Sequence, residues 1–428
     1  MDREEAGLER DFVPRCDSDA MVPSQKERVL FMSAGKSQVG RIYMDANATT
    51  PLLPEVVEAM RPYWTEQFGN ASSIHLDGQQ ARTAIDRARE TLAEFFNCHE
   101  AEVVFNSGGT EGDNTALFGI LHPGDHLITT SIEHSAVLQA AKKLERFGVT
   151  TTYVAPQASG LIEPTDILRA IRPETRLISV MLANNETGVL QPVAEIGKIA
   201  ADTGVFFHID AVQGAGKVKF DVRQWGAHLV SISGHKVHAP KGVGAMFVRK
   251  GTPVDSLIVG GSHERRRRAG TENVPGIVAL AKAVEVAMHS IEDGTMTRLA
   301  GLRDKLETGV LALPATGLNG ALSDGKPASR VANTTNIWFD NLEGEALVIA
   351  LDLKGVAVSG GSACHSGATE PSHVLMAMGL NKHRAGASLR FSLLKTVTEA
   401  QIDRVLEVLP EAVQSLRALA PVSAGTLA

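Results

Sequence analysis

The chain has 428 residues, of which 43% are hydrophobic and 21% are charged, and its formal net charge is -7. This length allows a large buried core and predicts two domains, and no apolar run is long enough to cross a lipid bilayer. The acidic balance argues against nonspecific nucleic-acid binding as the main role, so we expect neither a membrane nor a direct nucleic-acid partner.

The cysteine content indicates a reducing compartment. The chain holds three cysteines, Cys16, Cys98 and Cys364, which do not make the disulfide framework of a secreted protein. We therefore expect a cytoplasmic protein. Cys98 follows a predicted helix and is interpreted as a small buried side chain without a chemical role.

Residues 1–38 are predicted to form a disordered tail. Charged residues of both signs are mixed with Gly, Pro and Ser there, and no helical or strand period persists. The segment has neither the apolar core of a signal peptide nor the composition of a transit peptide. Met21 and Met32 are alternative starts of the protein, so we expect truncation to residue 39 to leave activity unchanged.

Ordered structure is expected from residue 41 onward. A short strand leads into the polar turn 45–51, Pro54 opens a helix, and a longer helix is predicted at 76–96. From residue 102 apolar runs alternate with helical patterns, which predicts an α/β fold with a mostly parallel seven-stranded sheet. The predicted strands lie at 102–105, 126–129, 151–154, 177–182, 205–209, 229–232 and 245–248. Ligands of such sheets bind beyond the carboxyl ends of the strands.

Polar residues follow several of these strands. The turn 106–114 is rich in small residues and opens a helix, so Gly109 and Thr110 are candidates to hold a phosphate group, with an ordinary capped turn as the alternative. His134 lies just past a strand, where a lone histidine is more often structural than functional. The asparagine-rich turn 183–188 also ends a strand, but such turns are common.

Asp210 and Lys236 add a carboxylate and an amine at the same edge of the predicted sheet. Asp210 ends an apolar strand, where burial of its charge needs a cationic or N–H partner. Lys236 lies in a loop rich in Gly and His; alone it is most simply a surface lysine, although a lysine amine can also condense with an aldehyde. Pyridoxal 5′-phosphate needs this set: a lysine for its aldehyde, an acid for its ring nitrogen and a cup for its phosphate. No metal site is predicted.

The second half of the chain is expected to leave the large sheet. Four consecutive arginines at 265–268 precede Thr271 and are interpreted as an anion-facing loop rather than as a solvated patch or a nucleic-acid contact. We expect a large domain at 54–291 and a small domain made of 39–53 and 292–428. Further predicted elements are a long helix near 277–312, a strand at 333–339 and helices at 344–353 and 398–416.

Two reactive groups are predicted in the small domain. Cys364 lies in a loop of small residues, 355–371, which favours an accessible, reactive thiol over a buried structural one. Arg390 lies in the strand-like stretch 388–392. Its planar guanidinium suits a substrate carboxylate, because the fork binds both oxygens, and a surface arginine is the alternative.

Together these motifs resemble those of the cysteine desulfurases, which are fold-type I pyridoxal-phosphate enzymes of the class V aminotransferase family. The resemblance covers residues 41–416, and its motifs occur in the order 45–51, 107–111, 133–135, 184–188, 208–213, 233–236, 268–274 and 362–364. The cysteine loop is similar to that of group I members, whose loop is longer. The stretch 268–273 is most similar to nitrogen-fixation-type and iron–sulfur-cluster-type members.

The resemblance implies a role for each matching residue. Lys236 would bind the cofactor aldehyde and move the substrate α-proton, Asp210 would pair with the pyridine nitrogen, and His134 would stack on the ring. Cys364 would attack the substrate sulfur. The other implied contacts are to the cofactor ring oxygen (Asn185, Gln213), its phosphate (Gly109, Thr110, Ser233, His235), the phosphate of a partner subunit (Thr271) and the substrate carboxylate (Arg390, Asn185).

The implied activity is conversion of L-cysteine to L-alanine, with the sulfur kept on Cys364 as a persulfide. The resemblance also implies a homodimer and a sulfur-acceptor protein, either an iron–sulfur scaffold or a thiolation relay. The alternatives are a selenocysteine lyase or other C–S lyase of this fold, and a scaffold that binds the cofactor without turnover. The chain departs from the family pattern at Ala239, at Leu394–Lys395 and in its C-terminal residues 417–428. Only the departure at 417–428 bears on the sulfur acceptor, because family members dock a scaffold protein with that end.

Overall fold

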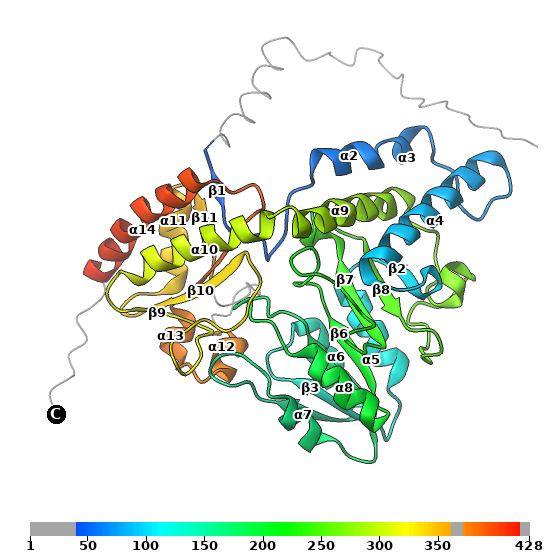
Figure 1. Cartoon of the computed structure of the whole chain (residues 1–428), viewed down its shortest axis with the longest axis horizontal. Coiled ribbons are helices and arrows are strands. Elements are labelled where there is room, and N and C mark those ends of the chain that lie inside the picture. Colours follow the sequence, from blue (N-terminus) through cyan, green and yellow to red (C-terminus); the bar gives the residue numbers. More distant parts are fainter. Residues whose placement is uncertain (1–39, 361–370, 420–428) are drawn as a thin grey trace, which may run out of the picture. The chain divides into compact units, whose positions relative to one another are not determined.

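The computed structural model describes residues 40–360 and 371–419 of the chain (Figure 1). The described residues from Ile42 onward form one compact unit. Two predictions concern residues outside this described part, namely the tail at 1–38 and the reactive cysteine at position 364.

A seven-stranded sheet forms the centre of the larger part of this unit. Its strand order is β2-β8-β7-β6-β5-β3-β4, and β8 alone among these seven runs antiparallel to its neighbours. The strands are β2 (Val103–Asn106), β3 (His126–Thr130), β4 (Thr150–Val154), β5 (Thr175–Met181), β6 (Phe206–Asp210), β7 (Leu229–Ser233) and β8 (Gly244–Val248). The predicted α/β class and mostly parallel sheet are confirmed.

Helices cover both faces of this sheet, because alternate strand residues point to opposite sides. Leu229 belongs to the hydrophobic cluster under α5 and α6, whereas its neighbour Val230 belongs to the cluster under α4 and α9. The connecting helices are α5 (Gly109–Ile120), α6 (Ser135–Glu145), α7 (Pro164–Ala170) and α8 (Val193–Thr203); α4 (Leu76–Phe96), α2 (Pro54–Met60), α3 (Pro62–Thr65) and α9 (Val274–Glu292) complete this part.

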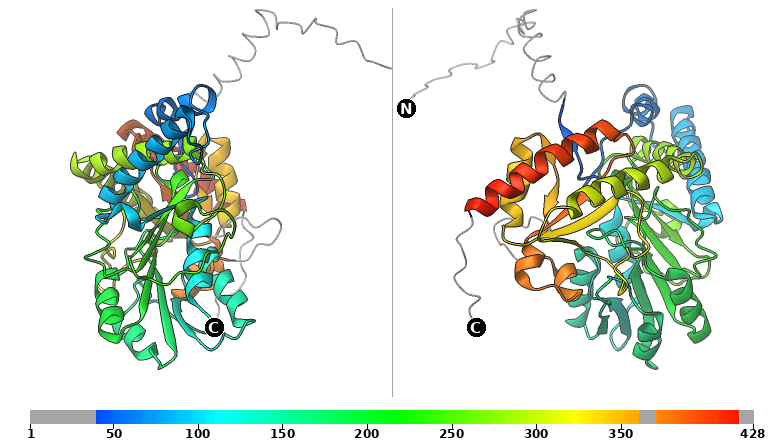
Figure 2. Two further views of the ribbon diagram at one scale, coloured as in Figure 1. Left: turned by 90° about the vertical axis from the view of Figure 1, so that its right-hand side faces the viewer. Right: turned by 60° about the vertical axis from the view of Figure 1, so that its left-hand side comes forward.

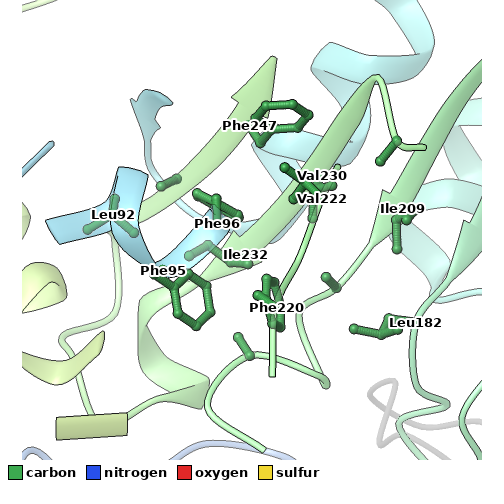
Figure 3. Packing of buried hydrophobic residues seen from close by; sticks show 14 of the residues in the cluster. Leu92, Phe95, Phe96, Leu182, Ile209, Phe220, Val222, Val230, Ile232 and Phe247 are labelled. Carbon is green, nitrogen blue, oxygen red and sulfur yellow. The ribbon is translucent and has the colours of Figure 1, made fainter. Parts of the chain in front are cut away.

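Aromatic side chains fill the cluster between α4 and the sheet (Figure 3). The rings of Phe95 and Phe220 are stacked with their centroids 4.3 Å apart, and Phe96 meets Phe95 edge-on at 5.3 Å. Such pairs add stabilisation beyond the burial of their area. This packing gives the strands that end at Asp210 and Ser233 a rigid base.

The helix predicted near 277–312 is two helices, α9 and α10 (Thr295–Leu311), which corrects the prediction. Gly294 separates them with a φ of 86°, a left-handed conformation that ends a helix and that glycine adopts without strain. By length and composition α9 is also apolar enough to cross a membrane, contrary to the expectation from sequence. However, 56% of its apolar window is buried, and α9 packs against α4 and α2, as a core helix does.

A second sheet and a second hydrophobic cluster lie in the C-terminal part (Figure 2). The antiparallel order is β12-β13-β10-β9, and α10 packs against β9, β10 and α14. The cluster joins Ile42 and Met44 to residues from Leu299 to Val413. The domain boundaries given above stay a prediction. The elements are β1 (Ile42–Tyr43), β9 (Thr316–Leu318), β10 (Thr334–Phe339), α11 (Gly344–Leu353), β11 (Val356–Ala357), β12 (Ser359–Gly360), α12 (His373–Ala377), α13 (Lys382–Gly386), β13 (Ser388–Ser392) and α14 (Glu399–Leu419).

Candidate active site at the carboxyl ends of the strands

Five of the predicted site residues stand at strand ends along one edge of the large sheet. Asp210 and Ser233 are the last residues of β6 and β7. His134 caps α6 after β3, Gly109 opens α5 after β2, and Asn185 follows β5. Since these strands are parallel, their carboxyl ends meet on the same side, where ligands of such sheets bind.

Lys236 closes a 3₁₀ turn, Gly234–Lys236, directly after β7. Its Nζ donates to the carbonyl oxygens of Asn47 at 2.6 Å and Ala48 at 2.9 Å. Burial, together with the cation of Arg390, lowers the pKa of Lys236 to about 8. Roughly one amine in ten is therefore unprotonated at pH 7, and this nucleophilic form is far more abundant than at an ordinary lysine.

Asp210 and His134 interact electrostatically with each other and with Lys236. Asp210 is buried and its Oδ1 accepts from the N–H of Val212 at 2.9 Å; burial raises its pKa, and His134 opposes this rise. His134 accepts the N–H of Ala136 at Nδ1, 3.1 Å away, and desolvation lowers its pKa. A neutral imidazole that accepts at Nδ1 carries its proton on Nε2.

The start of α5 offers main-chain N–H groups to an anion. Its N-cap, Gly108, offers no side chain, so the N–H groups of the first turn at Gly109 and Thr110 have no side-chain cap. A Cβ at position 109 would lie 2.5 Å from Cγ2 of Val212, and one at position 108 would lie 3.4 Å from Oγ of Ser233. The turn, Ser233 and the residues after Asp210 are thus in close contact.

His235 and Thr271 are less closely joined to the start of α5. The Nδ1 atom of His235 lies 3.2 Å from Oγ1 of Thr49, and burial and Lys236 lower the pKa of His235 to about 4. Thr271 is exposed, and no hydrogen bond within the described chain links it to Gly109. The adjoining Arg268 pairs with Glu111 of α5 at 2.9 Å. The predicted contact of Thr271 with a partner subunit stays a prediction.

Arg390 stands in the middle of β13 and faces the large sheet. Its Nη1 donates to the main-chain oxygen of Asn185 at 3.0 Å, and its Nη2 pairs with Oδ1 of Asp45 at 2.7 Å. The Nε atom of Arg390 and Oδ1 of Asn185 are both buried, and neither has a hydrogen-bond partner among the residues that the structure describes. A donor and an acceptor left unsatisfied in one place suit a ligand that offers both.

Three residues of the site were not predicted from sequence: Asp45, Asn47 and Lys217. Asn47 is buried, and its backbone and amide groups bond to Lys236, Gln213, Asn185, Lys217, Thr334, Asn333 and Ser392. The motif 45–51 marked the segment, but nothing in its pattern assigned these contacts. Nothing in the sequence marked Lys217 as a site residue, because a lysine in a turn is usually exposed to solvent.

The described residues on either side of the Cys364 segment attach close to Arg390 and Asn185. Ser359 of β12 pairs with Arg390 in the antiparallel register. On the other side, Oγ of Ser372 donates to Glu186 at 2.5 Å, and Nε2 of His373 lies 3.0 Å from the carbonyl oxygen of Glu133.

These groups fit pyridoxal 5′-phosphate. The uncapped start of α5 offers N–H groups for a phosphate. Within the described part of the chain, no cation donates a hydrogen bond to the buried Asp210, and a protonated ring nitrogen would supply one. Lys236 offers an amine for an aldehyde. No cluster of three or more metal-ligating side chains occurs among the residues that the structure describes.

Comparison with known proteins gives a consistent assignment. The family model described as "Aminotransferase class-V" matches residues 42–405. The chain is 48% identical over 386 residues to "Cysteine desulfurase IscS" of Methanosarcina thermophila, covering 89% of this chain and 94% of that protein. It is 48% identical over 384 residues to "Cysteine desulfurase" of Trichormus azollae, with the same coverage.

Solved structures agree. A "NIFS-LIKE PROTEIN" superposes with a TM-score of 0.81 at 34% identity, covering 88% of this chain and 100% of the other. The structure titled "SspA in complex with cysteine" has a TM-score of 0.72 at 35% identity, covering 82% and 98%. The chain therefore belongs to the aminotransferase class-V family and, within it, to the cysteine desulfurases.

Proposed function

We propose that this protein takes the sulfur of L-cysteine, releases L-alanine and keeps the sulfur on Cys364 as a persulfide for an acceptor protein. The observation that carries the proposal is the position of the substrate site. Arg390 and Asn185 lie between the amine of Lys236 and the chain on either side of Cys364. A ligand held there would lie beside the amine of Lys236 and near the described residues that flank the segment of Cys364.

Substrate binding falls to Arg390 and Asn185. The carboxylate of an amino acid accepts a hydrogen bond from Nε of Arg390, which is one of the donors of the planar guanidinium group. Oδ1 of Asn185 takes a donor that the ligand brings. Burial of both atoms strengthens these hydrogen bonds, because water does not compete for them.

The cofactor, when bound, supplies an electron sink for the negative charge that follows removal of the substrate α-proton. Gly109, Thr110 and Ser233 would hold its phosphate, with His235 as a further predicted contact. Asp210 would hold the proton on its ring nitrogen, with His134 beside the ring. Lys236, whose pKa is about 8, accepts the α-proton at Nζ and returns it later, as a base poised near the operating pH can.

The sulfur step uses Cys364 as a thiolate. Its Sγ attacks Sγ of the substrate, a bond forms between the two sulfur atoms, and the carbon–sulfur bond of the substrate breaks. The electron pair of that bond stays with the carbon fragment, which takes up protons and leaves as alanine. One thiol and one cysteine thus give one persulfide and one alanine, and no external oxidant is needed.

The test compares two cysteine variants. Cys364→Ala should keep the absorbance of the bound cofactor and lose alanine and persulfide formation. Cys98→Ala is the matched control, because burial raises the pKa of Cys98 to about 12 and makes its thiol inert. Full activity of Cys364→Ala would falsify the persulfide role, and Lys236→Ala should abolish the absorbance of the lysine-bound cofactor.

The finer parts of the proposal concern substrate and partners. A higher kcat/KM on L-selenocysteine than on L-cysteine would favour a selenocysteine lyase. Absence of alanine production would favour a sulfur-delivering scaffold. We propose a cytoplasmic homodimer in which Thr271 reaches the phosphate of the partner subunit. Labelled sulfur followed from Cys364 to its acceptor would distinguish an iron–sulfur scaffold from a thiolation relay.

A further inference from the structure

Lys217 lies beside the site and is not used by the proposed mechanism. It follows Gln213 by four residues in a helical turn, which places both side chains on one side of the turn. The Nζ atom of Lys217 donates to Oε1 of Gln213 at 2.8 Å and to Oδ1 of Asn47 at 2.9 Å. Both acceptors are side-chain amides that belong to the site.

A lysine amine determines which way an amide faces. The two ends of a glutamine amide have nearly the same shape, so hydrogen bonding alone decides its orientation. The amine of Lys217 offers donors and therefore holds Oε1 of Gln213. With the amide flipped, a donor would face the amine, and Oε1 would face the carbonyl oxygen of Asn47.

The fixed orientation presents the donor end of Gln213 to the reactive amine. Nε2 of Gln213 donates to the carbonyl oxygen of Asn47 at 2.9 Å, and Nζ of Lys236 donates to that same oxygen at 2.6 Å. Gln213 is 5% exposed, so water does not replace these bonds. The N–H of Gln213 is thus held beside the atom to which the cofactor aldehyde would bind.

The arrangement works for either protonation state of Lys217. Burial and the cations of Lys236 and Arg390 lower the pKa of Lys217 well below its usual range. An unprotonated amine still has two N–H donors, which is the number of acceptors that it meets here. Lys217 also lines a small, partly open pocket together with Lys236 and Lys395.

We propose that Lys217 is a positioning residue that fixes the amide of Gln213 so that Nε2 donates to the ring oxygen of the cofactor. The inference rests on the proposed function, in which Gln213 contacts that oxygen. A hydrogen bond to the ionised ring oxygen stabilises it relative to the protonated form. Lys217 therefore affects both cofactor affinity and the pH at which the bound cofactor changes its absorbance.

The test is a double-mutant cycle with Lys217→Met, Gln213→Leu and the double variant. The readouts are the Kd of apoenzyme for pyridoxal 5′-phosphate and the pH midpoint of the absorbance change of the bound cofactor. We expect Lys217→Met to weaken binding about tenfold, as loss of one buried hydrogen bond does, and to raise the midpoint. In the Gln213→Leu background, Lys217→Met should add no further change.

Two controls separate positioning from general damage. Lys219→Met removes an exposed lysine two residues away and should leave both readouts unchanged. Lys217→Arg keeps N–H donors at this position, so its midpoint should lie closer to that of wild type than the midpoint of Lys217→Met does. Should Lys217→Met not fold, Lys217→Ala, which is smaller than lysine and has no side-chain donor, enters the same cycle.

The outcomes are distinguishable. Unchanged Kd and midpoint in Lys217→Met, or effects that add to those of Gln213→Leu, overturn the inference and leave the proposed function standing. Wild-type apoenzyme that binds no pyridoxal 5′-phosphate overturns both. Effects that vanish in the Gln213→Leu background support the inference, since a merely structural role of Lys217 would persist there.

Discussion

Glu186 is a buried carboxyl group whose ionisation should control stability near neutral pH. It is 7% exposed and accepts a hydrogen bond from Oγ of Ser372 at 2.5 Å. Burial raises its pKa to about 7, although Ser372 and Arg390 oppose the rise. The folded protein therefore holds a proton on Glu186 at pH values where the unfolded chain has released it.

The sign and size of the effect follow from this difference. Between pH 4.5 and about 7 the folded state binds more protons than the unfolded state, so stability falls as pH rises. The contribution of Glu186 is fully present below 4.5 and is lost by about 7. At about 1.36 kcal/mol per pH unit the loss is roughly 3 kcal/mol of unfolding free energy. Glu186→Gln has no proton to lose, so it should escape this loss.

The assay is the thermal unfolding midpoint of cofactor-saturated wild type and Glu186→Gln from pH 5 to 8. About 2.5 kcal/mol of this loss falls between pH 5 and 8. At about 2 °C per kcal/mol, the low end of the range for larger domains, the variant should gain about 5 °C relative to wild type across this pH range. Glu133, whose pKa burial raises to about 8, titrates in both proteins and cancels in the difference. Glu195→Gln, an exposed change on α8, is the control. A difference independent of pH would refute the reasoning.

Three further predictions concern other contacts. Asp45→Asn frees Arg390 from its partner at 2.7 Å and should raise KM for L-cysteine about tenfold with a smaller change in kcat; a lower KM would show that the carboxylate competes with substrate. Arg89→Met removes the cation that pairs with the buried carboxylate of Glu264 at 2.6 Å. Denaturant unfolding should therefore show a loss of about 3–5 kcal/mol in the free energy of unfolding. Gly197→Ala places a methyl group 1.8 Å from the main-chain oxygen of Trp225. This overlap should lower the free energy of unfolding by at least about 3 kcal/mol. Gly301→Ala, in an open helix position, should cost nothing by the same assay.

The large sheet was predictable because its signals are local. The strand β7 was expected at 229–232 and occupies Leu229–Ser233, and α4 was expected at 76–96 and occupies those residues. Asn97, which follows α4, adopts a left-handed conformation with φ of 57°, and asparagine is one of the residues that tolerate it. Such caps and apolar runs are read from a few neighbouring residues.

The contacts between distant segments were not predictable in this way. Asp45 and Arg390 are separated by 345 positions, and Lys236 and Asn47 by 189. No period or motif links such pairs, so only the fold reveals that Arg390 already has an anionic partner. The break at Gly294 was missed for a different reason: an isolated glycine does not by itself end an otherwise continuous helical pattern.

Asn47 explains why the segment 45–51 has to lie between the two sheets. Its main-chain oxygen accepts from Lys236, and its Nδ2 donates to the main-chain oxygen of Asn185 at 3.1 Å. That oxygen also accepts from Nη1 of Arg390 at 3.0 Å. A continuous chain of hydrogen bonds thus runs from the guanidinium to the amine. The segment 45–51 therefore fixes the resting position of the amine through the same residue, Asn47, that shares an acceptor with Arg390.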